Sequence, residues 1–259
     1  MLRLLTLSAL VATAALAVAS AQGRPPRDAD VEAGVFMETN AFRAQNGLSE
    51  VTPNAVLAGE AQAFADYLAR SGAFSHTADG REPGQRAQAA GYRYCTLAEN
   101  IAYEQDSLGF RTDRLIQLFV SGWEGSPGHR RNMLNPDVTE MGVGLAKAPG
   151  VDEKYVAVQV FGRPLALRRR FRIENRTGTP QAYAFEGGSH AIPPRTAVIY
   201  SSCGSPDLEF DPEAVRGRSR YQIEPNAAYI LAPTPDGVRV EVMRRLSSES
   251  SGRPDPDPS

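Results

Sequence analysis

Histidine and cysteine are scarce in this sequence of 259 residues, which contains three histidines and two cysteines. Neither sign of charge predominates, because 28 basic residues stand against 30 acidic ones and the formal net charge is −2. A protein whose main partner is nucleic acid carries a strongly basic surface, so we expect no nucleic-acid partner. The sequence also has no internal repeat and no His-Glu-x-x-His pattern, which excludes the helix motif of the common zinc proteases.

Long apolar runs are confined to the amino terminus. Arg3 precedes an almost unbroken apolar run over residues 4–18, and Ala19-Ser20-Ala21 follows it. This order is typical of a secretory signal peptide, so residues 1–21 are expected to be removed. An uncleaved membrane anchor is the alternative, but the run is shorter than the roughly 20 residues that a spanning helix needs. We therefore expect a secreted or periplasmic protein with no transmembrane segment after cleavage.

The two cysteines form an even set, which in an exported chain indicates a disulfide. Cys95 and Cys203 are 203 − 95 = 108 residues apart. Closing a loop of that length contributes roughly 4–5 kcal/mol in the chain-entropy model. A bridge would join the two halves of the chain that are described next, and two separate buried thiols are the alternative.

The first half of the chain has the periodicity of helices. Asp30 is expected to cap a helix that ends near Gln45, and Asn54 to cap a second helix. A short helix is expected around residues 85–90. Two more are expected over residues 112–123 and 127–134, the latter opened by Ser126-Pro127.

Strand patterns follow the helices. Residues 141–146 and 154–161 are rich in β-forming residues and are separated by a Pro-Gly turn, which indicates an α+β sandwich. After that the helical pattern disappears and six short β candidates follow, over residues 170–175, 182–186, 196–201, 220–223, 229–231 and 238–243. We therefore divide the mature chain into a main domain over residues 22–163, a small all-β domain over 164–246 and a disordered tail over 247–259.

The scarce histidines mark candidate functional positions. His76 follows the second expected helix, His129 begins a short helix, and Glu99 lies between them in a largely apolar stretch. Two imidazoles and a carboxylate are good ligands for zinc or another divalent cation, and they also suit general acid–base work. The carboxylate can instead orient an imidazole. Spacing alone does not bring the three together, so ordinary surface groups remain the alternative, and His190 fits only a solvated loop.

Five motifs occur in a fixed order between about Val31 and Arg163. They are Asn40-x-x-Arg43; Phe74-Ser75-His76 with Asp79-Gly80; Glu99-Asn100-Ile101-Ala102; Trp123 with Ser126-Pro127-Gly128-His129-Arg130 and Asn132; and Met141-Gly142-Val143-Gly144 followed by Tyr155 to Gln159 and Phe161-Gly162. In this order they resemble the bacterial form of the cysteine-rich secretory protein, antigen 5 and pathogenesis-related (CAP) superfamily. Each motif is weak by itself, but five in order are specific.

The resemblance implies a three-layer α-β-α sandwich with a central cleft. It also implies that His76, Glu99 and His129 converge on the floor of the cleft and that the two histidines bind zinc or another divalent cation. The family has a second acid three residues after the tryptophan, where this sequence has Ser126. Glu124 is nearby but is expected to point elsewhere on its helix. The expected ligand cleft therefore contains Ser126 in place of the acid, and the family's set of four is incomplete.

Three functions are compatible with these features. The resemblance favours a non-enzymatic module that binds a small molecule, a lipid or a peptide. The first alternative is a metal-assisted, protease-like hydrolase, with the metal on His76 and His129 and with Glu99 as general base. Neither cysteine lies in a catalytic thiol motif, and no catalytic residue is assigned. The second alternative is a structural or adhesive protein of the cell envelope, with the all-β domain as its contact surface.

Overall fold

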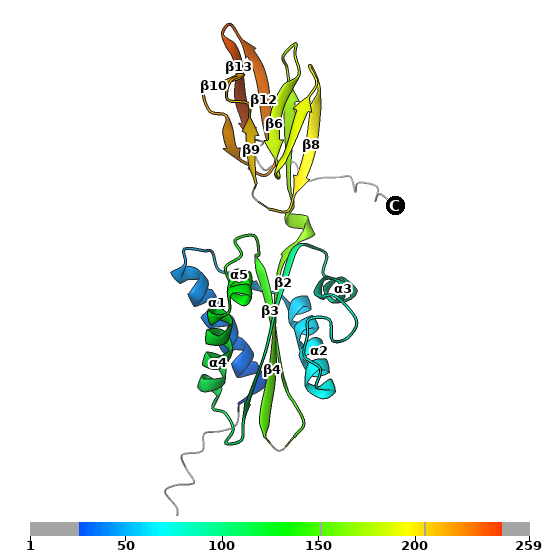
Figure 1. The fold of residues 1–259 in the computed structure, drawn as a ribbon, viewed down its shortest axis with the longest axis vertical. Helices are drawn as coiled ribbons and strands as arrows, with labels where there is room; N and C mark the ends of the chain where they lie inside the picture. Colours follow the sequence, from blue (N-terminus) through cyan, green and yellow to red (C-terminus); the bar gives the residue numbers. More distant parts are fainter. Residues whose placement is uncertain (1–25, 151, 205, 245–259) are drawn as a thin grey trace, which may run out of the picture. The chain divides into compact units, whose positions relative to one another are not determined.

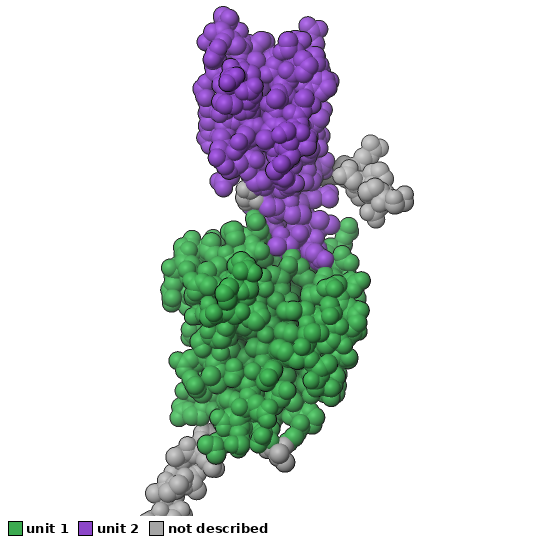
Figure 2. Space-filling model, in the orientation of Figure 1, with its two compact units in different colours: residues 1–93, 97–162 green, residues 94–96, 163–259 purple. Residues whose placement is uncertain are grey.

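The computed structural model describes residues 26–150, 152–204 and 206–244. The expected signal peptide (1–21) and tail (247–259) lie outside the described residues. The chain divides into two compact units, shown in different colours in Figure 2: residues 1–93 and 97–162 form unit 1, and residues 94–96 and 163–259 form unit 2. Each unit is described by itself below.

Unit 1 contains all the α-helices of the described residues. They are α1 (Asp28–Gln45), α2 (Ala55–Ser71), α3 (Pro83–Ala89), α4 (Thr112–Gly125) and α5 (Pro127–Met133). Asn54 caps α2 as predicted, because its side chain accepts hydrogen bonds from the backbone N–H groups of Val56 and Leu57. The predicted cap at Asp30 is wrong. The first helix begins at Asp28, and the residue before it, Arg27, makes no side-chain capping bond.

A four-stranded sheet runs through unit 1 in the order β1-β3-β4-β2. Its strands are β1 (Thr52–Pro53), β2 (Tyr94–Asp106), β3 (Glu140–Lys147) and β4 (Glu153–Pro164). The sequence patterns predicted β3 and β4, which pair antiparallel with Val143 opposite Gln159. They did not predict β2, which is the longest strand of the described residues at 13 residues.

Helices cover both faces of this sheet. Figure 1 shows α1, α4 and α5 on one side and α2 and α3 on the other. The glycines of β3 explain how closely α2 packs. A Cβ atom at Gly142 would lie 2.2 Å from the backbone of α2, and one at Gly144 would lie 2.3 Å from it. Unit 1 is therefore the expected three-layer α-β-α sandwich.

The core of unit 1 lies between the sheet and the layer of α1 and α4. Trp123 and Phe119 of α4 stack with their ring centroids 6.0 Å apart and are almost completely buried. Val31 and Val35 of α1 and Phe161 of β4 belong to the same cluster. This burial of large apolar side chains is the main contribution to the stability of the unit.

Unit 2 is an all-β domain, as predicted, apart from one 3₁₀ turn at Leu165–Leu167. Its strands are β5 (Arg169–Asn175), β6 (Gln181–Phe185), β7 (Gly188–Ile192), β8 (Ala197–Ser202), β9 (Asp207–Phe210), β10 (Val215–Arg216), β11 (Arg220–Gln222), β12 (Ala227–Thr234) and β13 (Gly237–Arg244). They form two sheets, in the orders β10-β13-β12-β5-β8 and β11-β9-β6-β7. Phe171 and Tyr229 from the first sheet and Phe185 and Phe210 from the second share one core. The two sheets therefore pack as a sandwich.

Some details of unit 2 differ from the expectation. The patterns missed β7, β9 and β10, which are strands of two to five residues. His190 lies on β7 rather than in a loop, and its ring stacks on Tyr183 with a centroid distance of 5.2 Å. Stacking accounts for its position, and the residue stays outside the candidate site.

A disulfide joins Cys95 to Cys203, so the alternative of two separate thiols is wrong. Cys95 lies at the start of β2, and residues 94–96 cluster with unit 2. The bridge thus lies within unit 2 rather than between the two units. It fastens residues 94–96 to the later strands of that unit. Among the described residues, none of the helices has the length and apolar composition needed to cross a membrane.

Candidate functional site

The candidate site begins with His76 in the loop after α2. Gly72, with φ 71°, ends the helix in the left-handed conformation, and the chain turns back towards β2. Nδ1 of His76 lies 2.8 Å from Oε1 of Glu99. Since an ionised carboxylate has no proton to give, Nδ1 carries the hydrogen and donates it. In the neutral ring the other nitrogen, Nε2, then carries the free lone pair, and the side chain is 47% exposed.

Glu99 is held from two sides. Its side chain is 1% exposed, Oε1 accepts from His76, and Oε2 accepts from Nη2 of Arg86 at 2.5 Å. Burial of an unpaired carboxylate costs several kcal/mol, and the two donors offset that cost. Glu99 therefore acts as a fixed acceptor that sets the orientation of the His76 ring.

Arg86 is the centre of a buried cluster that was not foreseen from the sequence. Its Nε donates to Oε1 of Glu60 at 2.9 Å, and Nη1 donates to Oδ1 of Asp79 at 3.1 Å. Nη1 also donates to the carbonyl oxygens of His76 and Arg81, at 2.9 Å each. Burial alone would lower the pKa of Arg86, but the charge and hydrogen bonds of Glu99 and Glu60 raise it above its ordinary value. The guanidinium thus stays charged while it ties the loop of His76 to β2 and α2.

The ring of Phe64 completes the surroundings of Arg86. The guanidinium carbon lies 3.5 Å from the centroid of this ring, which is within the range of a cation–π contact. A sequence signal for the cluster does exist. Glu60 lies at helical spacing on the apolar face formed by Leu57, Ala61 and Phe64, and an acid on a buried face needs a buried partner. The signal does not identify Arg86 as that partner, and it does not identify the other acids of the cluster.

His129 approaches from α5 and is half-buried. Burial, and secondarily the charge of His76, lowers the pKa of His129 below its ordinary value of 6.5. His129 is consequently neutral at physiological pH, the form in which an imidazole binds a metal ion.

A network of side-chain amides positions α5 against β2. Nδ2 of Asn132 donates to the carbonyl oxygen of Glu99 at 3.1 Å and to Oδ1 of Asn100 at 2.8 Å. Nδ2 of Asn100 donates to Oε1 of Gln159 at 3.0 Å and to the carbonyl oxygen of His129 at 3.3 Å. The asparagines of two sequence motifs therefore hold the helix of His129 beside the strand of Glu99.

Ser126 lies at the junction of α4 and α5. It is the residue before α5, but its side chain makes no capping hydrogen bond. Glu124 lines a different cavity, together with Glu38 of α1, as expected from its place on the helix. The structure thus joins His76 to Glu99 by a hydrogen bond and holds α5, the helix of His129, beside β2. That His76, Glu99, Ser126 and His129 together line a ligand cleft stays a prediction.

The donor set determines what metal ion the site could hold. No group of three or more His, Cys, Asp and Glu side chains in the described ranges is arranged to bind a metal. Glu99 is committed to His76 and Arg86, which leaves two imidazoles as protein ligands. A carboxylate on the second nitrogen of a histidine is a common feature of metal sites. The residues therefore fit a divalent cation held by two imidazoles and completed by water or ligand atoms, and they do not fit a closed structural zinc site.

Two exposed aromatic rings, one of them in the loop of His76, contact each other. Phe74, two residues before His76, meets Tyr103 of β2 edge to face, with ring centroids 5.0 Å apart. Nζ of Lys154 lies 4.3 Å from the centroid of Tyr103. Both rings are more than 40% exposed. Exposed aromatic rings beside a cation offer contact area to an apolar or aromatic ligand.

Most of unit 1 is similar to known proteins. Residues 36–161 match the family model "CAP: Cysteine-rich secretory protein family". The uncharacterised protein YkwD of Bacillus subtilis is 30% identical over 114 residues, which are 44% of this chain and 41% of the relative. The chain thus spans less than half the length of this curated relative.

Two solved structures are also similar. An extracellular protein with an SCP domain from Bacillus anthracis is 26% identical with a TM-score of 0.43, over 52% of this chain and 41% of that one. A cysteine-rich secretory protein from Staphylococcus aureus is 22% identical with a TM-score of 0.40, over 53% of this chain and 40% of that one.

Proposed function

The chain belongs, through residues 36–161, to the bacterial members of the cysteine-rich secretory protein (CAP) family, and from this premise we propose that it is an exported, non-enzymatic binding module. Its ligand site is formed by His76 and His129, with Phe74 and Tyr103 beside them. The ligand is a small molecule, a lipid or a peptide segment that has an apolar part for the rings and an oxygen donor for the histidines.

The hydrogen bonds and the burial of Glu99 favour a binding function over hydrolysis. In a metal-assisted hydrolase, a general base must reach the attacking water within hydrogen-bond distance. Each oxygen of Glu99 already has a partner, and its side chain is 1% exposed, so water has no access to it. Both cysteines form the disulfide, so neither provides a nucleophilic thiolate. These observations favour a role for Glu99 in positioning His76.

A divalent cation is part of this proposal. His76 would offer Nε2 and His129 a neutral imidazole, while Glu99 fixes the ring of His76. A bound cation would supply a Lewis acid that attracts a carbonyl, carboxylate or phosphate oxygen of the ligand. With two protein ligands, its affinity is expected to be lower than that of a site with four.

Zinc calorimetry on the mature protein tests the site. We expect saturable one-to-one binding that is lost in the variant His76→Ala/His129→Ala. His190→Ala is the matched control, because it removes the third histidine from unit 2 and should leave binding unchanged. Absence of binding in the unaltered protein would overturn the cation part of the proposal.

The hydrolase alternative has its own test. Turnover of a peptide library that is lost in a folded His129→Ala variant and reduced in Glu99→Gln would contradict a non-enzymatic role. Absence of turnover together with retention of an apolar fluorescent probe, lost in Phe74→Ala/Tyr103→Ala, would support the binding module. Leu108→Ala is the control, because it removes an apolar side chain that is still more exposed, at 95%, and is not part of the proposed site.

A further inference from the structure

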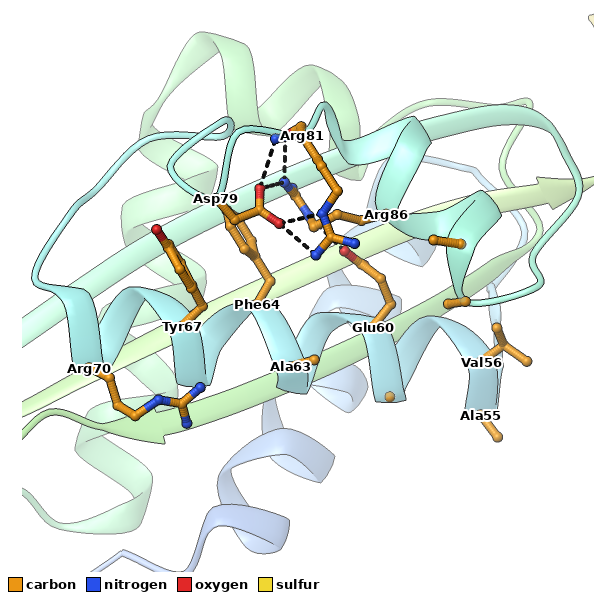
Figure 3. Close-up of a pocket in the computed structure, with 13 residues that line it drawn as sticks. Ala55, Val56, Glu60, Ala63, Phe64, Tyr67, Arg70, Asp79, Arg81 and Arg86 are labelled. Atoms are coloured by element: carbon orange, nitrogen blue, oxygen red, sulfur yellow. Dashed lines mark hydrogen bonds and ion pairs between the residues drawn. The ribbon is translucent and has the colours of Figure 1, made fainter.

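Two cavities that have arginines in their walls differ in what those arginines bind. In the groove between α2 and α3, Arg81 and Arg86 both donate to Asp79, and Figure 3 shows both side chains beside this carboxylate. The second cavity, of about 410 Å³, lies in unit 2 where β5 ends and β8 begins. Its volume is within the range of about 300–1,000 Å³ that is common for small-molecule sites. The charged residues in its wall are one acid, Glu174, and three arginines, Arg172, Arg176 and Arg195.

Glu174 holds two of these arginines in place. Its Oε1 accepts from Nε of Arg176 at 2.7 Å, and its Oε2 lies 3.1 Å from Nη2 of Arg172. The hydrogen bond from Arg176, and after it the charges of both arginines, keeps the pKa of Glu174 below its ordinary value, although burial opposes this. The ionised carboxylate thus uses one nitrogen of each guanidinium and leaves the other nitrogens available.

The turn between β7 and β8 holds the third arginine, Arg195, at the same cavity. Asn175, the last residue of β5, is 1% exposed and fastens this turn. Its backbone N–H donates to the carbonyl oxygen of Thr196 at 2.9 Å, and its Nδ2 donates to the carbonyl oxygen of Pro193 at 3.1 Å. The turn is therefore fixed against the strand that carries Arg172 and Glu174.

Arg195 is an unusual residue for its backbone conformation. Its φ of 57° lies in the left-handed region, which glycine adopts without strain and other residues adopt at a cost. Its side chain is exposed and makes no hydrogen bond or ion pair with another residue of the described chain. A ligand of the guanidinium would explain an arginine at this position, whereas the contacts of the fold do not.

The charges of the cavity do not balance. The three arginines carry three positive charges and Glu174 carries one negative charge, so the lining has a net charge of 3 − 1 = +2. The charge of Glu241 also acts on Arg176, but Glu241 is itself paired with Arg239 at 2.9 Å. A phosphate monoester carries a charge of about −1.5 to −2 at pH 7 and has strong acceptor oxygens, so it matches this excess.

We propose that this cavity of unit 2 binds the phosphate group of a phosphate monoester, with Arg195 and the available nitrogens of Arg172 and Arg176 donating to its oxygens. Guanidinium groups suit phosphate because their paired N–H donors match its geometry. A carboxylate ligand has a single charge and binds more weakly, and a cationic ligand is repelled. The same phosphate group occurs in soluble monoesters and in the headgroup of phosphatidic acid.

Nitrogen–proton correlation NMR of the arginine Nε–H groups in the mature protein tests the proposal. Titration with ethyl phosphate at constant ionic strength should shift the Nε signals of Arg172 and Arg195 saturably. Sodium propionate, which has the same ethyl group on a carboxylate, should shift them much less. Absence of a saturable shift with ethyl phosphate, or an equal response to propionate, would overturn the proposal.

Arg195→Gly is the decisive variant, because glycine adopts a φ of 57° without strain and the turn should still form. It should weaken the binding of ethyl phosphate about fivefold, the upper end of what one exposed ion pair contributes. Arg218→Gln is the matched control, at an exposed arginine of unit 2 outside the cavity, and should leave the affinity unchanged. Equal affinities of Arg195→Gly and the unaltered protein would contradict a site at this cavity.

Vesicles distinguish the two sources of the phosphate group. Sedimentation with phosphatidylcholine vesicles that contain phosphatidic acid, lost in Arg195→Gly, would identify the lipid headgroup as the ligand. Binding of ethyl phosphate without such sedimentation would identify a soluble monoester, and either result supports the site. The variant His76→Ala/His129→Ala should bind ethyl phosphate as the unaltered protein does, so failure of the histidine site and failure of this cavity are distinguishable.

Discussion

Arg86 and Glu99 form a buried ion pair between α3 and β2, with Nη2 of the arginine 2.5 Å from Oε2 of the glutamate. Their side chains are 3% and 1% exposed. The same carboxylate accepts from Nδ1 of His76. The orientation of a candidate ligand-binding histidine thus depends on a short helix that contributes no residue to the histidine site.

Replacing Arg86 by methionine should destabilise unit 1 by about 3–5 kcal/mol, because Glu60 and Glu99 would remain buried without their cation. Urea unfolding followed by the fluorescence of Trp123, the single tryptophan of the chain and a core residue of unit 1, measures the loss. Arg86→Lys should recover only part of it, since an ammonium cannot reproduce the fork of hydrogen bonds. Arg93→Met is the control at an exposed arginine, and an equal loss there would refute the role of Arg86.

The stability of unit 1 should fall as the pH rises from 4.5 towards 7. The pKa of Glu60 is raised from 4.5 to about 7 in the folded chain, so its protonated form favours folding. This contribution is complete below pH 4.5 and is lost as the pH rises through about 7, with a total of roughly 3 kcal/mol. Glu60→Gln should flatten the profile in this window, and Glu50→Gln should not. An unchanged profile in Glu60→Gln would show that Glu60 is ionised without cost.

His129 should titrate below pH 6.5, because burial and the charge of His76 both disfavour its protonated form. Proton NMR of the imidazole rings measures the pKa. His76→Ala removes the neighbouring charge and should raise the pKa of His129, whereas His190→Ala should leave it unchanged. If His76→Ala leaves the pKa of His129 unchanged, the two imidazoles do not interact.

Gly142→Ala should destabilise unit 1, because the new methyl group would lie 2.2 Å from the backbone of α2. Overpacking of this kind costs about 1–3 kcal/mol, and here neither the strand nor the helix has a flexible side chain that can yield. Gly122→Ala in α4 meets open space and should stabilise its helix by about 0.5–1 kcal/mol. Equal effects of the two substitutions in urea unfolding would contradict the tight packing of α2 on β3.

Removing the disulfide should affect unit 2 in particular. The bridge closes a loop with a sequence separation of 108, for which the chain-entropy model predicts a loss of roughly 4–5 kcal/mol. In calorimetry, Cys95→Ser/Cys203→Ser should lower the unfolding temperature of unit 2. The unfolding temperature of unit 1, which Trp123 fluorescence reports, should change less. If the unfolding temperature of unit 1 fell and that of unit 2 did not change, the prediction would be wrong.

The positions of most helices could be predicted from the sequence because their signals are local. Asn54, for example, caps α2 through a hydrogen bond to a residue only two positions away. The strand β2 could not be predicted, although it carries Glu99. Its exposure changes from half-buried through buried to exposed along its length rather than alternating, so it lacks the period of two that marks a strand.

The sequence by itself determined the order of five motifs, the boundaries of most helices and the residue types of the histidine site, because short-range periodicity and hydrogen bonding encode them. Only the tertiary structure decided which partners those residues have. Glu60 lies 26 positions before Arg86 and Glu99 lies 13 positions after it, and no spacing rule specifies either contact. Such contacts form because a buried charge must find its counterion wherever the packing of α2, α3 and β2 brings one.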